Sequence, residues 1–109
     1  MNPDTTRLLM EFDRLLREAN RAAINPILEE LSIDQLKPLA EMVARARAVY
    51  LKHLHDLALK YQADAGLPSD AEMTALALLR SRFMDLVEGS KSFETAIQRG
   101  YLDVAARNK

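Results

Sequence analysis

The sequence has no cysteine and no tryptophan, and it contains only three glycines and four prolines among 109 residues. Without cysteine the chain cannot form disulfides, thiol nucleophiles or thiolate metal sites, so its stability cannot come from cross-links. Few glycines and prolines leave room for few turns, and few turns in a chain of this length predict long helices. With only three Phe and three Tyr, any core is built mainly from aliphatic side chains and methionine.

A strong charge of either sign and a long apolar run are also missing. The 15 Lys and Arg residues oppose 16 Asp and Glu residues, so the chain lacks the positive field expected of a nucleic-acid-binding protein. No run approaches the roughly 20 apolar residues that a membrane helix needs. The start of the sequence shows no signal-peptide pattern. We therefore expect one cytoplasmic domain over residues 1–109, with no membrane segment.

Residues 36–61 are the centre of the predicted fold because they carry two apolar stripes at helical spacing. The broad stripe consists of Leu36, Leu39, Val43, Ala46, Tyr50, Leu54, Leu57 and Tyr61, and the second stripe consists of Ala44, Ala48, Leu51, His55 and Ala58. A helix that is apolar on most of its sides is covered on most of its sides. We therefore expect a central helix over about residues 33–65.

The two ends of this central helix have recognisable signals. Ser32 and Gln35 have the spacing of a capping box, and Gly66 is a natural left-handed terminator. Pro38 lies beyond the first turn and removes one helical hydrogen bond. It leaves two alternatives, a bent helix from Ile33 or a single turn followed by a helix from Pro38.

A shorter helix is predicted before the central one, over about residues 5–24. Its apolar stripe consists of Leu9, Phe12, Leu16, Ala19 and Ala23. Asp or Thr within residues 3–6 is expected to cap its start. Pro26 ends or kinks this helix, and we favour a new short helix over residues 26–31 with Asn25 as its cap.

A third helix is predicted over about residues 70–99, after a capping box of Ser69 and Glu72. Its apolar stripe steps by three and four without a fault and consists of Leu76, Leu79, Phe83, Leu86, Ser90, Phe93 and Ile97. The pattern continues through Gly89, which favours one unbroken helix even though an internal glycine costs about 1 kcal/mol relative to alanine. Gly100 is expected to end the helix, with Tyr101 folding back against the last turn.

Together these segments predict an all-α antiparallel helical bundle. Its main part is a long hairpin of residues 33–65 and 70–99, and the helix over 5–24 packs against it. That first helix is too short to cover the hairpin, and unpartnered apolar helix surface usually marks an interface. We expect self-association, most simply as a two-fold homodimer. The alternative is a monomer in which the connector and the C-terminal tail close the gaps.

The candidate interface lies on apolar positions that the hairpin seam does not use. These residues are Ala44, Ala48, Leu51, His55, Leu78 and Met84.

No grouping of residues predicts catalysis, a metal site or a cofactor site. His53 and His55 are two apart on a helix and point in different directions, so they cannot chelate one ion. The di-iron motif needs an acid three residues before a histidine, but Tyr50 and Lys52 occupy those positions. The three glycines are too scattered to form a phosphate-binding loop.

We therefore expect a protein that is not an enzyme and that acts through protein–protein interaction, as an adaptor, small chaperone, inhibitor or regulatory subunit. A second copy of the chain is the first expected partner, and another protein is the second. The alternative is a small nucleic-acid-associated regulator that uses the basic face of Arg45 and Lys52, near Arg47 and Lys60. A third alternative is a bundle that holds an apolar ligand between Met and Tyr side chains.

Overall fold

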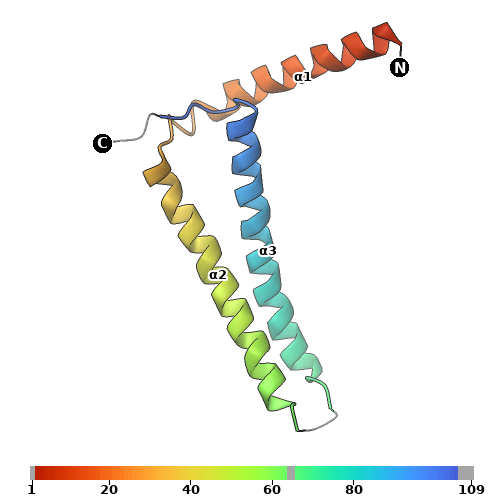
Figure 1. The fold of residues 1–109 in the computed structure, drawn as a ribbon, viewed down its shortest axis with the longest axis vertical. Coiled ribbons are helices and arrows are strands. Elements are labelled where there is room, and N and C mark those ends of the chain that lie inside the picture. The colour runs from red at the N-terminus through yellow and green to blue at the C-terminus, as the bar shows by residue number, and fades with distance from the viewer. Residues whose placement is uncertain (1, 64–65, 106–109) are drawn as a thin grey trace. The chain divides into compact units, whose positions relative to one another are not determined.

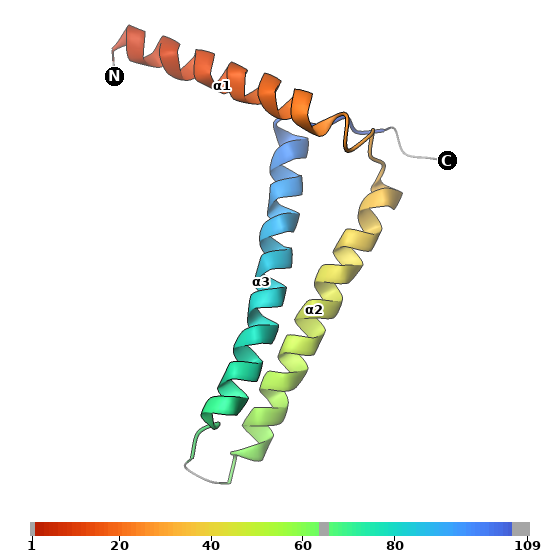
Figure 2. The ribbon, with the colours of Figure 1, turned by 180° about the vertical axis from the view of Figure 1, so that it is seen from behind.

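The structure is a computed structural model that describes residues 2–63 and 66–105. These residues form three helices, α1 (Pro3–Ile24), α2 (Ile33–Lys60) and α3 (Asp70–Gln98). Within the described ranges there is no β-strand beyond one isolated bridge, so the all-α prediction is confirmed. Figure 1 shows α2 and α3 running antiparallel beside each other as a helical hairpin, and Figure 2 shows the same pairing from behind. Of the helices described, none has the length and apolarity to cross a membrane.

The described chain divides into two compact units. One unit consists of residues 37–91, which are most of α2 and α3. The other consists of the residues up to Leu36 together with those from Ser92 onward. The single domain expected from the sequence stays a prediction.

Helix α1 begins at Pro3, two residues before the predicted start, because Asn2 caps it. The Asn2 Oδ1 atom accepts a hydrogen bond from the Thr5 amide at 2.7 Å. Pro3 follows at the first helical position, where its missing N–H costs no helical bond. The predicted Asp or Thr cap is therefore wrong, although Asp4 still places an acid at the positive end of the helix.

The predicted short helix over residues 26–31 is absent from the structure. Asn25 has helical backbone angles (φ −54°, ψ −41°) and donates its amide to Arg21, so it ends α1 instead of starting a new helix. The chain then closes a turn in which the Ile27 and Leu28 amides donate to the Ile24 carbonyl at 3.0 Å and 2.7 Å.

The backbone after this turn finds partners in the C-terminal tail instead of in a helix. The Leu31 amide donates to the Asp103 carbonyl at 3.0 Å, and the Ala105 amide donates to the Leu31 carbonyl at 2.7 Å. Buried backbone groups need such partners, and the tail satisfies them at this point. Leu102 is only 3% exposed in this unit, whereas the Val104 side chain stays exposed.

Helix α2 runs without interruption from Ile33 through Pro38, so the alternative start at Pro38 is wrong. Half of the first capping box is formed as predicted, since the Ser32 amide donates to Gln35 Oε1 at 2.8 Å. The Gln35 amide donates to the Ser32 carbonyl at 3.1 Å instead of to its hydroxyl.

Helix α2 ends at Lys60, earlier than the predicted end near residue 65. The Tyr61 amide still donates to Leu57, and the Gln62 amide donates to Leu59 at 3.4 Å, which tightens the last turn. Residues 64 and 65 lie outside the described part.

Helix α3 is unbroken through Gly89, as the stripe predicts. Its capping box is complete, because the Ser69 amide donates to Glu72 Oε1 at 2.9 Å and the Glu72 amide donates to Ser69 Oγ at 3.2 Å. At the other end Gly100 adopts φ 71°. The Tyr101 amide donates to the Ala96 carbonyl at 2.8 Å, and the Gly100 amide donates to Ile97 at 3.2 Å. These two bonds form a Schellman motif and confirm the predicted terminator.

Candidate interaction surface

The unit of residues 37–91 is held together by one row of side chains from each helix. The half-buried or buried residues of α2 are Leu39, Val43, Ala46, Tyr50, His53 and Leu57, and those of α3 are Glu72, Leu76, Leu79, Phe83, Leu86, Val87 and Ser90. The Tyr50 and Phe83 rings stack at the middle of this seam, with centroids 6.0 Å apart. Of the described residues in this unit, only Leu57 is buried. Two helices alone thus form a seam and not an enclosed core.

The predicted broad stripe of α2 matches this seam except at one position. Leu54 is exposed, and His53 is the half-buried residue between Tyr50 and Leu57. The seam of α2 alternates steps of four and three residues. His53 keeps this alternation, whereas Leu54 would place two steps of four in succession. The His53 Nε2 atom is buried and has no hydrogen-bond partner among the described residues.

Glu72 connects the end of α2 to the start of α3. Its carboxylate accepts hydrogen bonds from Lys60 Nζ at 2.8 Å, from the Tyr61 hydroxyl and from the Ser69 amide at 2.9 Å. The Lys60 bond, followed by those from Tyr61 and Ser69, lowers the pKa of Glu72 to about 2. The carboxylate therefore stays ionised and fixes the connection between the two helices, which is a structural role.

All six candidate interface residues from the sequence are exposed: Ala44, Ala48, Leu51, His55, Leu78 and Met84. Successive residues of a helix are rotated by about 100° around its axis, so these six residues do not all face the same way. Ala44, Leu51 and Met84 lie on one side of the seam, and Leu78 lies on the other side. Ala48 lines a shallow hollow that also contains His53.

Sequence reasoning missed a second group of surface residues beside the seam. A hollow on this side of the hairpin is lined by Met42, Arg45, Ala46, Val49, Arg82, Asp85 and Leu86. The signal was present in the sequence, because Met42, Ala46 and Val49 follow the same spacing of four and three as the seam. Helical phase places Leu78 on this side of the hairpin as well.

The predicted basic cluster has partners inside the chain. Lys52 pairs with Asp56 at 2.7 Å, which lowers the pKa of that carboxyl, and Lys60 pairs with Glu72. The Arg47 guanidinium lies 5.1 Å from the centroid of the Phe83 ring. Arg45 and Lys52 are both exposed. Of these four residues, only Arg45 has no ion pair or ring contact within the described part of the chain.

Helix α1 uses its polar edge, not its apolar face, to contact its own unit. Asp13 pairs with Arg99 at 3.4 Å, and Arg21 donates to the Gly100 carbonyl at 3.1 Å and to the Asp103 carboxylate. No residue of α1 is buried, and the apolar residues Leu8, Phe12 and Leu15 are exposed.

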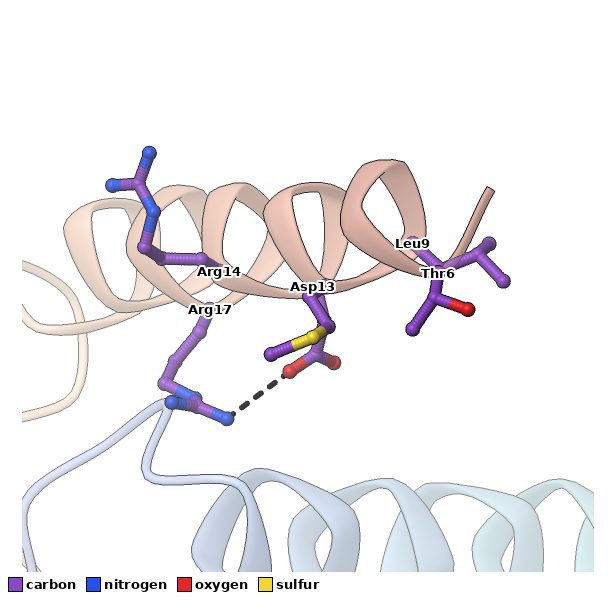
Figure 3. A pocket seen from close by; sticks show the side chains of 6 residues that line it. Thr6, Leu9, Asp13, Arg14 and Arg17 are labelled. Carbon is purple, nitrogen blue, oxygen red and sulfur yellow. Dashed lines mark hydrogen bonds and ion pairs between the residues drawn. The ribbon is translucent and has the colours of Figure 1, made fainter. Parts of the chain in front are cut away.

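A hollow on α1 is lined by Thr6, Leu9, Met10, Asp13, Arg14 and Arg17. Figure 3 shows that it is the side of a single helix, along which Arg17 reaches Asp13. This ion pair spans 3.1 Å, and Arg14 pairs with Glu11 and Glu18. The charged groups are therefore satisfied within the helix, and the hollow offers no convergent ligand chemistry.

The described residues contain no cluster of three or more side chains suited to hold a metal ion. The surface that distinguishes this chain is thus its exposed apolar helix surface. Comparison with protein-family models, curated proteins and solved structures finds no match to this chain.

Proposed function

We propose that the chain is a non-catalytic protein–protein interaction module that pairs with a second copy of itself through the helical hairpin. One observation carries this proposal. Within the unit of residues 37–91 the hairpin leaves five large aliphatic side chains 42–53% exposed, namely Val49, Leu51, Leu54, Leu59 and Leu78. Only Leu57 is buried among the described residues of that unit.

The seam between two helices buries little apolar area. Ordering each residue costs about 1–2 kcal/mol of backbone entropy, and burial of apolar area must offset that cost. Covering a half-exposed Leu or Val contributes about 1 kcal/mol. A second hairpin covers those of these side chains that lie on one side of the seam and brings four helices together, a common arrangement for antiparallel helices.

The functional class that this surface supports is an adaptor, small chaperone, inhibitor or regulatory subunit. Each of these acts by binding a protein partner, and the fully buried centre of such an interface is more apolar than the rest of the surface. The alternative of a nucleic-acid-associated regulator relies on the basic face of Arg45 and Lys52. The in-chain partners of Lys52, Lys60 and Arg47 count against it, because phosphate contacts require free cations.

The proposal is tested by thermal unfolding over about a hundredfold range of protein concentration. A dimer that dissociates on unfolding is stabilised by mass action, so its midpoint rises with concentration. We expect a rise of several degrees. A midpoint that does not change with concentration would contradict self-association, which is the main support for the proposed function.

A further inference from the structure

Four residues form a line along one face of α3, a quarter turn away from the seam. They are Leu78, Arg82, Asp85 and Gly89, and their spacing is four, three and four residues. We call this line the Leu78 stripe. All four residues are exposed and lie within the unit of residues 37–91.

Each member of the Leu78 stripe has a property that its own chain does not explain. Leu78 is 53% exposed. Arg82 and Asp85 have no ion pair or hydrogen bond through their side chains within the described part of the chain. Gly89 is a poor helix former in mid-helix, yet a Cβ built there would meet no atom within 4 Å. No neighbour in the described chain therefore requires a glycine at this position.

The spacing of four, three and four reads the same in both directions along the helix. A two-fold axis between residues 83 and 84 therefore sets an antiparallel copy of α3 against this stripe in one defined register. Leu78 then lies over Gly89 of the second copy, and Arg82 lies beside Asp85 of the second copy. Both contacts occur twice, as an isologous interface requires.

We propose that α3 packs antiparallel on α3 of a second copy through the Leu78 stripe. This inference rests on the proposed function, since it names the surface by which the chain pairs with itself. Leu78 fills the open space above a glycine, and two reciprocal pairs of opposite charge set the register. The hollow with Met42, Val49 and Leu86 extends the apolar contact beside the stripe.

The charges of α3 favour this side over the opposite one. The opposite side carries Arg80 and Lys91, two exposed cations eleven residues apart. On that side, a two-fold axis between residues 85 and 86 would set Arg80 against Lys91 of the second copy, and such like-charge contacts oppose association. The Leu78 stripe is self-complementary, whereas the Arg80 side is not.

The first test reverses single charges and compares dimer dissociation by sedimentation. We expect Arg82→Asp alone and Asp85→Arg alone to weaken the dimer about tenfold or more, because each sets like charges together twice. Mixing the two variants sets two acidic side chains against two basic ones. We therefore expect native mass spectrometry to show the mixed dimer in excess over both parent dimers. The matched control is Arg80→Asp, two residues away on the opposite side of α3, which should leave the dimer at wild-type strength or tighter.

The second test fixes the register with engineered thiols, since the chain has no cysteine of its own. Leu78→Cys and Gly89→Cys are made as separate variants and oxidised alone and mixed. Residues 78 and 89 are about 16 Å apart within one helix, too far for a disulfide, which needs Cα atoms within about 7 Å. In the proposed register only the mixture brings the two thiols together. We expect a covalent dimer from the mixture and none from either variant alone.

The outcomes separate this inference from the proposed function. A wild-type chain with a single-copy mass overturns both. A wild-type dimer that is unchanged by Arg82→Asp and Asp85→Arg, with no covalent dimer from the mixed thiol variants, overturns the Leu78 stripe and keeps self-association.

Discussion

Lys60 donates a hydrogen bond from Nζ to Oε2 of Glu72 across 2.8 Å, which joins the last residue of α2 to the first turn of α3. The same carboxylate also accepts from the Tyr61 hydroxyl and from the Ser69 amide. One acidic side chain therefore caps α3 and holds the neighbouring helix end. The antiparallel hairpin depends on this contact as well as on its apolar seam.

Replacing Glu72 by glutamine should lower hairpin stability in a pH-dependent way. The folded-state pKa of Glu72 lies at about 2, below its ordinary value of 4.5, with the Lys60 bond as the largest cause. A lowered pKa gives stability that is present above about pH 4.5 and is lost as the pH falls through about 2. We expect Glu72→Gln to lower the midpoint of thermal unfolding at pH 7 and to differ less from wild type near pH 2.

The control for this experiment is Glu88→Gln, which changes an exposed acid on the same helix. All proteins are compared at one concentration, so that any self-association contributes equally. An equal loss for Glu72→Gln at both pH values would show that the charge of Glu72 is not what holds the helix ends.

Replacing His53 by leucine should stabilise the hairpin. The His53 side chain occupies the α2 seam, and its buried Nε2 has no partner among the described residues. An unpaired buried polar group costs about 1–3 kcal/mol, and leucine adds apolar contact at the same position. We expect the free energy of unfolding to rise by about 1 kcal/mol in chemical denaturation.

His55→Leu is the matched control, because His55 is exposed two residues away. It should change the unfolding free energy by less than about 0.5 kcal/mol. A loss of stability in His53→Leu would contradict the claim that the unpaired imidazole nitrogen destabilises the seam.

Replacing Arg21 by alanine should loosen the C-terminal tail without unfolding the helices. Arg21 donates to the Gly100 carbonyl and to the Asp103 carboxylate, and the neighbouring tail pairs with Leu31. Exposed ion pairs contribute about 0–1 kcal/mol, so the global unfolding midpoint should hardly change. Hydrogen exchange should become faster at the Leu31 and Ala105 amides, whose bonds hold the tail in place. Unchanged exchange at both amides would show that Arg21 does not anchor it.

Replacing Gly89 by alanine should have an effect that depends on self-association. Alanine favours a helix by about 1 kcal/mol over glycine, and a Cβ at Gly89 meets nothing within 4 Å in the described chain. In an Arg82→Asp background, at a concentration where sedimentation shows that variant as a monomer, the unfolding free energy should rise by that amount. In the otherwise unchanged chain the gain should be smaller, because the new methyl group narrows the space for Leu78 of the second copy. An equal rise in unfolding free energy in both backgrounds would show that no second helix packs at Gly89.

The features that the sequence predicted correctly are those decided by residues close together in the chain. The capping box of Ser69 and Glu72 needs only two side chains one turn apart. Gly100 and Tyr101 close the last turn of α3 on its own carbonyls. The apolar stripe of α3 repeats without a fault and correctly predicted one continuous helix through Gly89. These local signals were sufficient for the hairpin and its order of elements.

The predictions that failed depend on contacts between distant residues. Leu31 bonds with Asp103 and Ala105, and no local pattern indicates that the connector would pair with the tail instead of forming a helix. The choice between His53 and Leu54 for the seam depends on how the two helices wind around each other. A seam that repeats every 3.5 residues falls out of phase with a straight helix, which has 3.6 residues per turn.

The candidate surface could be predicted only in part. Exposure of Leu51, Leu78 and Met84 followed from their places outside the seam, and the structure has all three exposed. Knowing which of these residues lie on the same side of the hairpin required the positions of the two helices. The spacing of the Leu78 stripe was visible in the sequence, but the missing partners of Arg82 and Asp85 were not.

The most direct test of the account is the mass of the unmodified chain at micromolar concentration, measured by equilibrium sedimentation. The account predicts a species of about twice 12.3 kDa that dissociates on dilution. A single species of 12.3 kDa at all concentrations would contradict it, because the exposed apolar side chains of the hairpin would then face water with no second copy to cover them.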